Sequence, residues 1–144
     1  MLLFSYGSNG IQQLADRLGH PVEALPAYLP EHGRVFRGWS QGWGGGVASI
    51  LWDPDRTVFG NVTRVSGADL KVLDSYEGAN MSPPRYRRKR FKVQVDEGNG
   101  FEEKKAIAYV STSKEFNAPS REYVAAVQRN LQGFWQGDMT IDIA

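Results

Sequence analysis

Short runs rich in β-branched and aromatic residues, each bounded by turn-forming residues, limit what this chain can fold into. Runs of this kind predict strands. Six strands are expected, at Leu2–Tyr6, Arg34–Ser40, Val47–Trp52, Val58–Val65, Tyr86–Asp96 and Lys105–Ser111. The segment Asp53-Pro54-Asp55 has the turn chemistry of a hairpin connection between the third and fourth strands. The segment Glu97-Gly98-Asn99-Gly100 predicts a turn between the last two.

Two or three helices are expected beside these strands. Apolar residues recur at helical spacing in Ile11–Leu18, which predicts a short first helix. Ser66 is a suitable N-cap for a helix over Gly67–Tyr76, and Gly78 would end it. A last helix is predicted from about residue 120 to residue 131. These elements indicate a compact, barrel-like α+β fold of about six strands and two or three helices.

Composition restricts the class of protein further. At 144 residues the chain fits one domain, residues 1–144. Its net charge of +1 gives no overall attraction to nucleic acid or acidic membranes. It has no cysteine, which excludes disulfides and thiolate chemistry, and no apolar run of about 20 residues that could span a bilayer. The N-terminus has no signal-peptide pattern, so we expect a cytoplasmic protein without membrane partners.

The four residues Tyr6-Gly7-Ser8-Asn9 follow the first predicted strand directly. Gly7 permits a backbone conformation closed to other residues, and Ser8 and Asn9 favour tight turns. Successive unpaired backbone N–H groups in such a turn form an anion-binding nest. The pattern is therefore consistent with a site for a substrate carboxylate, or with an ordinary turn that only ends a strand.

Glu77 is the candidate catalytic residue. It shares one face of the predicted helix with Leu70 and Leu73, so its carboxylate continues an apolar stripe. Partial burial would raise its pKa and suit it to general acid–base work. The alternative is a solvated carboxylate at a frayed helix end. A Glu near a helix C-terminus is unfavourable with the helix dipole, so stability does not explain the residue.

The run Arg85–Arg90 holds five positive charges around Tyr86 and could bind nucleic acid or an acidic partner. The alternation of Phe91, Val93 and Val95 continues through it and would put two of its charges on the apolar face. We therefore expect a bulge or a solvated edge position.

Other features carry less weight. The segment Gly44-Gly45-Gly46 suits a hairpin tip or a close approach of backbone to a ligand. His20 and His32 have no spaced partners that would suggest a metal site, and no phosphate-binding glycine motif is present, so no metal or cofactor is expected. Phe134 and Trp135 suggest that the C-terminal segment docks on the domain.

Taken together, these segments resemble the γ-glutamylcyclotransferase family, including its AIG2-like members. The resemblance covers most of the chain and rests on the order and spacing of several pieces. They are Tyr6-Gly7-Ser8-Asn9, Gly45–Ile50, Val58–Val62, Leu73-Asp74-Ser75-Tyr76-Glu77-Gly78, Tyr86 with the following strand, Ala108-Tyr109-Val110 and Pro119–Tyr123.

The resemblance implies a small mixed β-barrel flanked by helices. It implies an enzyme that cyclises a γ-glutamyl compound to 5-oxoproline and releases an amino acid or an amine. Glu77 would be the general acid/base, and the turn Tyr6, Gly7, Ser8 and Asn9 would bind the substrate. Tyr86 and Tyr123, with Tyr6, are further candidates to line the pocket. Gly10 departs from the family, which usually has Leu there.

Two alternatives to this enzyme remain open. One is a non-catalytic AIG2-like module that binds a small molecule in the same pocket. The other is a nucleic-acid or acidic-partner protein using Arg85–Arg90, which the near-neutral charge balance disfavours. For the enzyme, we expect a small-molecule γ-glutamyl substrate as partner, no nucleic acid, and a monomer or a homodimer.

Overall fold

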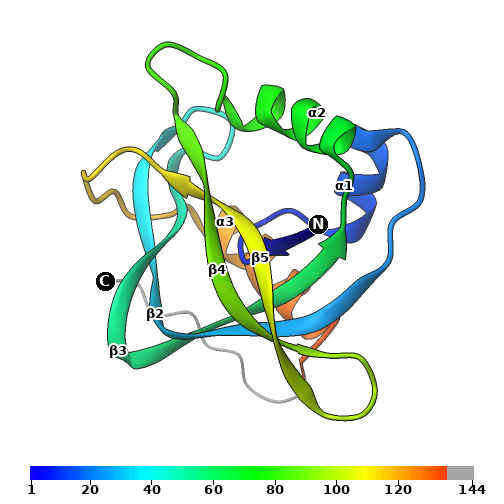
Figure 1. Ribbon diagram of the computed structural model, residues 1–144. Coiled ribbons are helices and arrows are strands. Elements are labelled where there is room, and N and C mark those ends of the chain that lie inside the picture. The colour runs from blue at the N-terminus through cyan, green and yellow to red at the C-terminus, as the bar shows by residue number, and fades with distance from the viewer. Residues whose placement is uncertain (136–144) are drawn as a thin grey trace.

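Five strands close into a barrel in the order β1-β3-β2-β4-β5 (Figure 1). The computed structural model describes residues 1–135. The strands are β1 (Leu2–Ser5), β2 (Ala24–Ser40), β3 (Gly45–Arg64), β4 (Tyr86–Asp96) and β5 (Phe101–Ser111). Neighbours pair antiparallel except β1 and β5, which pair parallel at Leu3 and Ile107. The mixed barrel implied by the resemblance is therefore confirmed.

The predicted hairpin connection at Asp53–Asp55 is wrong, because β3 runs straight through it. Its partner β2 begins ten residues earlier than predicted, at Ala24, and pairs with both halves of β3. Pairing passes from Pro30↔Thr57 to His32↔Trp52, so residues 53–56 bulge out opposite Glu31. Asp53 accepts a bond from the Asp55 N–H, so the turn chemistry is present, but inside a bulge. Five strands result instead of six.

Three helices flank the barrel, α1 (Ile11–Leu18), α2 (Gly67–Glu77) and α3 (Arg121–Gln132). Helix α2 begins with a reciprocal capping box between Ser66 and Asp69 and ends at Gly78 in a left-handed conformation. Figure 1 shows α1 and α2 together at one end of the barrel, with the β4–β5 turn on the opposite side. These bounds agree closely with those predicted.

Two apolar clusters hold these elements. The larger fills the barrel and includes Phe4, Phe36 and Val127 of α3. The smaller lies under α1 and α2, where Leu14 meets Leu70 and Leu73. Because the smaller cluster buries the face of α2 that leads to Glu77, it fixes the position of that carboxylate.

The chain after α3 docks on the barrel as far as the structure describes it. The indole N–H of Trp135 donates to the Gly60 carbonyl at 2.9 Å, and its ring packs on Phe59 and Phe101. The predicted docking is confirmed at Trp135, and residues 136–144 lie outside the described part.

The three glycines at the β2–β3 turn serve two purposes. Gly44 has a φ of 76° at the tip, as expected of a hairpin glycine. Cβ atoms at Gly45 and Gly46 would lie 2.6 Å from the Ala118 carbonyl oxygen and 2.0 Å from that of Asn117. The close approach is therefore made by the segment before α3, which locks this end of the hairpin in place.

Candidate active site

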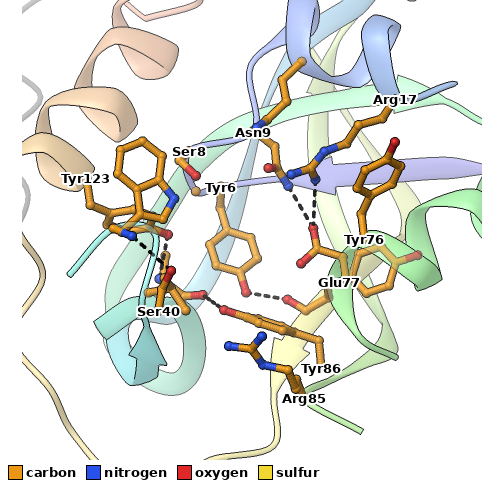
Figure 2. Close-up of a pocket in the computed structure, with 16 residues that line it drawn as sticks. Tyr6, Ser8, Asn9, Arg17, Ser40, Tyr76, Glu77, Arg85, Tyr86 and Tyr123 are labelled. Carbon is orange, nitrogen blue, oxygen red and sulfur yellow. Dashed lines mark hydrogen bonds and ion pairs between the residues drawn. The ribbon is translucent and has the colours of Figure 1, made fainter. Parts of the chain in front are cut away.

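A cleft of about 210 Å³ opens beside α1 and the C-terminal end of α2 (Figure 2). Its walls come from the turn after β1, both of these helices, the end of the β2–β3 hairpin, the start of β4, and α3. Every site residue predicted from the sequence lines it: Tyr6, Gly7, Ser8, Asn9, Glu77, Tyr86 and Tyr123. We call it the main cleft.

Glu77 is the last residue of α2 and points into the main cleft (Figure 2). Its side chain is 16% exposed. The Asn9 amide donates to Glu77 Oε1 at 3.1 Å, and a guanidinium nitrogen of Arg17 lies 3.7 Å from the same oxygen. Burial raises the pKa of Glu77, and the bond from Asn9 and the charge of Arg17 offset part of that rise. The result is a carboxylate whose pKa lies nearer to neutrality than usual.

Sequence reasoning missed Arg17. It lies in the last turn of α1, and its guanidinium carbon is 4.7 Å from the centre of the Tyr76 ring. This stacking holds the cation next to the Glu77 carboxylate. Nothing in the local sequence of α1 indicates that its end packs beside the end of α2, so the pairing could not be foreseen.

Contacts from α3 hold the turn Tyr6–Asn9 in place, and its backbone conformation is not unusual at Gly7. Gly7 does not take a positive φ, so the expectation that it supplies a special conformation is wrong. It supplies room, because a Cβ there would lie 3.2 Å from the Tyr123 hydroxyl. That hydroxyl accepts a bond from the Ala48 N–H at 2.7 Å, and Asn130 donates to the Gly7 carbonyl at 2.9 Å.

The turn offers free hydrogen-bond donors. Strand pairing ends at Ser5, and within residues 1–135 the N–H groups of Gly7, Ser8 and Asn9 donate to no other group of the protein. A segment that lines a cleft with unpaired N–H groups can accept an anion. The site therefore places three such donors in the same cleft as a carboxylate.

Two buried tyrosines, Tyr6 and Tyr123, and the partly buried Tyr86 complete the walls. The Tyr6 hydroxyl donates to the Tyr109 carbonyl, and that of Tyr86 donates to the Ala48 carbonyl at 3.4 Å. Burial raises the pKa of Tyr6, Tyr86 and Tyr123 above the ordinary value. All three stay protonated at neutral pH and serve as donors or packing groups, and Glu77 carries the one carboxylate among the lining residues that the structure describes.

A buried arginine behind the turn was also missed. Arg34 is 8% exposed and donates to the carbonyls of Tyr6 at 3.0 Å and Phe59 at 2.8 Å. Burial lowers its pKa to about 10, so it remains charged at neutral pH. Within residues 1–135 it forms no ion pair. Strand periodicity could have found it, since Arg34 lies two residues before the inward-facing Phe36 and so shares its side of β2.

The basic run lies outside the main cleft except at its start. Strand β4 pairs with β2 only near Gln94 and Val95, so Arg87–Arg90 have β5 alone as a neighbour. The predicted edge position is confirmed, without a bulge between β4 and β5. Arg88 is bound by Asp74, which reduces the charge available to a partner.

Two further properties bear on the class of site. The described part of the chain contains no group of three His, Asp or Glu side chains that could hold a metal. Among residues 1–135, no helix has the length and apolar character needed to cross a membrane.

The model of the family described as "Gamma-glutamyl cyclotransferase, AIG2-like" matches residues 3–129. The chain belongs to this family. A human protein named gamma-glutamylcyclotransferase is 30% identical over 128 residues, which is 85% of this chain. The chain spans 65% of that relative's length.

Solved structures of the family have the same fold. A protein titled gamma-glutamyl cyclotransferase aligns with a TM-score of 0.75 and 24% identity, covering all of this chain and 93% of that one. An uncharacterized human protein aligns with a TM-score of 0.71 and 26% identity, covering 99% of this chain and 92% of that one.

Proposed function

We propose that this protein is a γ-glutamylcyclotransferase, which converts a γ-glutamyl compound to 5-oxoproline with release of an amino acid or an amine. The observation that carries the proposal is the position of Glu77. A buried carboxylate with a raised pKa shares the main cleft with the free N–H groups of Gly7, Ser8 and Asn9. One group can move protons, and the others can hold an anion.

The reaction needs no water, metal or second substrate. The α-nitrogen of the γ-glutamyl group attacks the side-chain amide carbon, forming the C–N bond of a five-membered lactam. The bond from that carbon to the leaving nitrogen then breaks. Two protons leave the α-ammonium, and two arrive at the leaving nitrogen. Positioning of the two ends of an intramolecular reaction lowers its barrier by roughly 7–11 kcal/mol.

Glu77 would move these protons. An α-ammonium group ordinarily has a pKa of about 8, so it is mainly protonated at neutral pH and needs a base. Burial makes the Glu77 carboxylate a stronger base than an exposed one, and its conjugate acid can then protonate the leaving nitrogen. Asn9 would keep the carboxylate directed into the cleft, since its amide donates to Oε1.

The turn after β1 would hold the substrate. Its free N–H groups suit either the α-carboxylate or the oxyanion that forms on the attacked carbonyl. The charge of Arg34, bonded to the Tyr6 carbonyl next to this turn, adds a positive field that favours an anion there. Burying a charge without an ion pair has a free-energy cost. The contacts of Arg34 with two carbonyl groups do not by themselves explain why the fold keeps a charge there.

The test is 5-oxoproline release from γ-glutamyl amino acids and γ-glutamyl amines by wild type and Glu77→Gln. Glutamine keeps the shape and the bond from Asn9 but removes the base, so turnover should fall by roughly 10²–10⁴-fold. Glu103→Gln, an exposed change on β5, is the matched control and should leave turnover unchanged.

Near-normal turnover in folded Glu77→Gln would overturn the acid/base role. If wild type releases no product from any substrate but binds them, the protein is instead the non-catalytic binding module that shares the pocket.

A further inference from the structure

A second cleft, of about 260 Å³, lies next to the main cleft. Val47, Arg85 and Tyr86 line both of them. These three residues form the shared boundary of the two clefts, so a ligand that extends beyond the main cleft at Tyr86 and Arg85 reaches the second cleft. In Figure 2 these two residues lie together on the side of the main cleft opposite Asn9 and Arg17.

The second cleft is built from positively charged and neutral groups. Arg37 and Arg85 line it, and no acidic side chain of residues 1–135 does so. Within the same residues neither arginine forms an ion pair. One guanidinium nitrogen of Arg85 donates to the Trp39 carbonyl at 3.3 Å, and its other N–H groups remain for a ligand.

The backbone fixes Arg85 relative to Glu77. The Arg85 N–H donates to the carbonyl of Gly78, the residue after Glu77, at 3.0 Å. The Arg85 carbonyl accepts from the Thr112 N–H at 3.1 Å, which ties it to the end of β5. Because these bonds hold the base of the side chain, the second cleft keeps a set position relative to the carboxylate in the main cleft.

Two serines add donors, Ser111 at the end of β5 and Ser113 just after it. Ser111 Oγ accepts from the Ser113 N–H at 3.2 Å, and Ser113 Oγ accepts from the Glu115 N–H at 3.2 Å. Each hydroxyl accepts a backbone bond and so keeps its own proton to donate elsewhere. Guanidinium and hydroxyl donors around a cleft without acids are the groups that bind a carboxylate.

We propose that the second cleft is a leaving-group subsite for a carboxylate, with Arg37 and Arg85 as specificity-determining residues. The inference rests on the proposed function. The γ-glutamyl group occupies the main cleft against Glu77 and the turn Tyr6–Asn9, and the rest of the substrate passes Tyr86 into the second cleft. The favoured substrates are γ-glutamyl compounds whose leaving group carries a carboxylate, over neutral amines and amides of the same size.

Two matched pairs of substrates test this. One pair is γ-glutamyl-alanine and γ-glutamyl-alaninamide, and the other is γ-glutamyl-alanyl-glycine and its C-terminal amide. Within each pair only the carboxylate is replaced by an amide. Comparing the two pairs shows at which distance from the scissile bond the subsite recognises a carboxylate. The measurement is kcat/KM for 5-oxoproline release by wild type, Arg37→Gln, Arg85→Gln and Arg87→Gln, the last being an exposed β4 arginine outside both clefts.

Wild type should favour the acid in at least one pair by roughly 10- to 100-fold, the scale of a charge-assisted hydrogen bond. Arg37→Gln and Arg85→Gln should lose most of that preference, because turnover of the acid should fall more than turnover of the amide. Arg87→Gln should retain it. Equal rates within both pairs, or a preference that survives in both cleft variants, would overturn the subsite.

A failure of the proposed function gives a different result. In that case wild type forms no 5-oxoproline from any of the four compounds. Calorimetric titration of wild type and Arg85→Gln with the same compounds then tests the subsite by itself. The subsite is supported if wild type binds the acid more tightly than the amide and Arg85→Gln does not. Equal binding of acid and amide, or no binding, contradicts it.

Discussion

Burial raises the pKa of the Glu77 carboxylate and also makes the charged form costly for the fold. Its pKa is raised mainly because the charged form loses hydration in the native state. Below the unfolded pKa, about 4.3, the group is neutral in both states and costs nothing. As the pH rises above that value, the unfolded chain ionises first, so stability falls until the pH passes the raised native pKa.

Glu77→Gln should therefore be more stable than wild type at pH 7, and the difference should shrink towards pH 4. Glutamine retains an oxygen for the Asn9 amide but never ionises. Urea unfolding at the two pH values measures this, with Glu103→Gln as the exposed control. A variant less stable than wild type at pH 7 would show that Arg17 and Asn9 outweigh the burial of the charge.

The space at Gly7 is a second property of a single residue. Gly7→Ala would bring a methyl group to 3.2 Å from the Tyr123 hydroxyl, which its bond to Ala48 holds in place. Displacing the turn by part of an ångström should lower kcat/KM by between about 10- and 100-fold. Gly67→Ala, with nothing within 4 Å of the new methyl, is the matched control and should keep full activity. Equal activity of both variants would show that the turn tolerates movement.

At the scale of elements, Asp74 ties α2 to the sheet. Its carboxylate binds the guanidinium of Arg88 on β4 through both oxygens and accepts from the Tyr109 hydroxyl of β5 at 2.7 Å. Both groups hold the pKa of Asp74 below its ordinary value, with Arg88 the larger cause. Glu77 lies one turn further along the same helix, so this attachment also positions its carboxylate.

Asp74→Asn should cost about 1–3 kcal/mol of stability at pH 7, the range for a hydrogen bond to a charged group. A lowered native pKa means that the contribution is present above the unfolded pKa of about 3.9 and is lost as the pH falls through the native pKa. The deficit should thus vanish in acid. Urea midpoints at pH 7 and pH 3 check this, with the exposed Asp55→Asn as control. A deficit equal at both pH values would contradict an ionic origin.

Element bounds were predictable where local chemistry decides them. Ser66 and Gly78 mark the ends of α2 by capping, and the observed bounds of α1 and β4 are those predicted. The first half of β2 was missed because Pro26 and Pro30 disfavour a strand interior. The sequence of residues 53–56 predicts a hairpin turn where the structure has a bulge, because the same turn chemistry serves both and only the partner strand distinguishes them.

The same contrast holds within the site. Glu77 and the turn after β1 were identified because each has a local pattern, a helix face or a strand end. Arg17 and Asn130 make contacts between elements far apart in sequence, for which the chain carries no local pattern. Arg34 lies between these cases, since its strand periodicity already places it inside the barrel.

On the scale of the whole molecule, closing the barrel also builds the site. Strand β1 has only four residues and meets β5 at a single pair, Leu3 and Ile107. The residues directly after it form the turn Tyr6–Asn9. The closing strand therefore delivers the turn that lines the main cleft, and this cleft forms only once the barrel is shut.

The other end of the barrel carries stability without chemistry. Trp135 packs there with Tyr28, Phe59 and Phe101. None of these four residues lines either cleft. Trp135→Ala should lose about 2–3 kcal/mol, less than a fully buried tryptophan, because the indole is only half-buried.

Its kcat/KM at a temperature where it remains folded should match that of wild type, since no residue of this cluster lines the main cleft. Trp52→Ala, at a β3 residue that is 63% exposed, is the matched control and should change neither quantity. Thermal unfolding and 5-oxoproline release, measured on the same samples, separate the two effects. A loss of activity in folded Trp135→Ala would mean that the two ends are coupled through the barrel, and that its closure is adjustable rather than fixed.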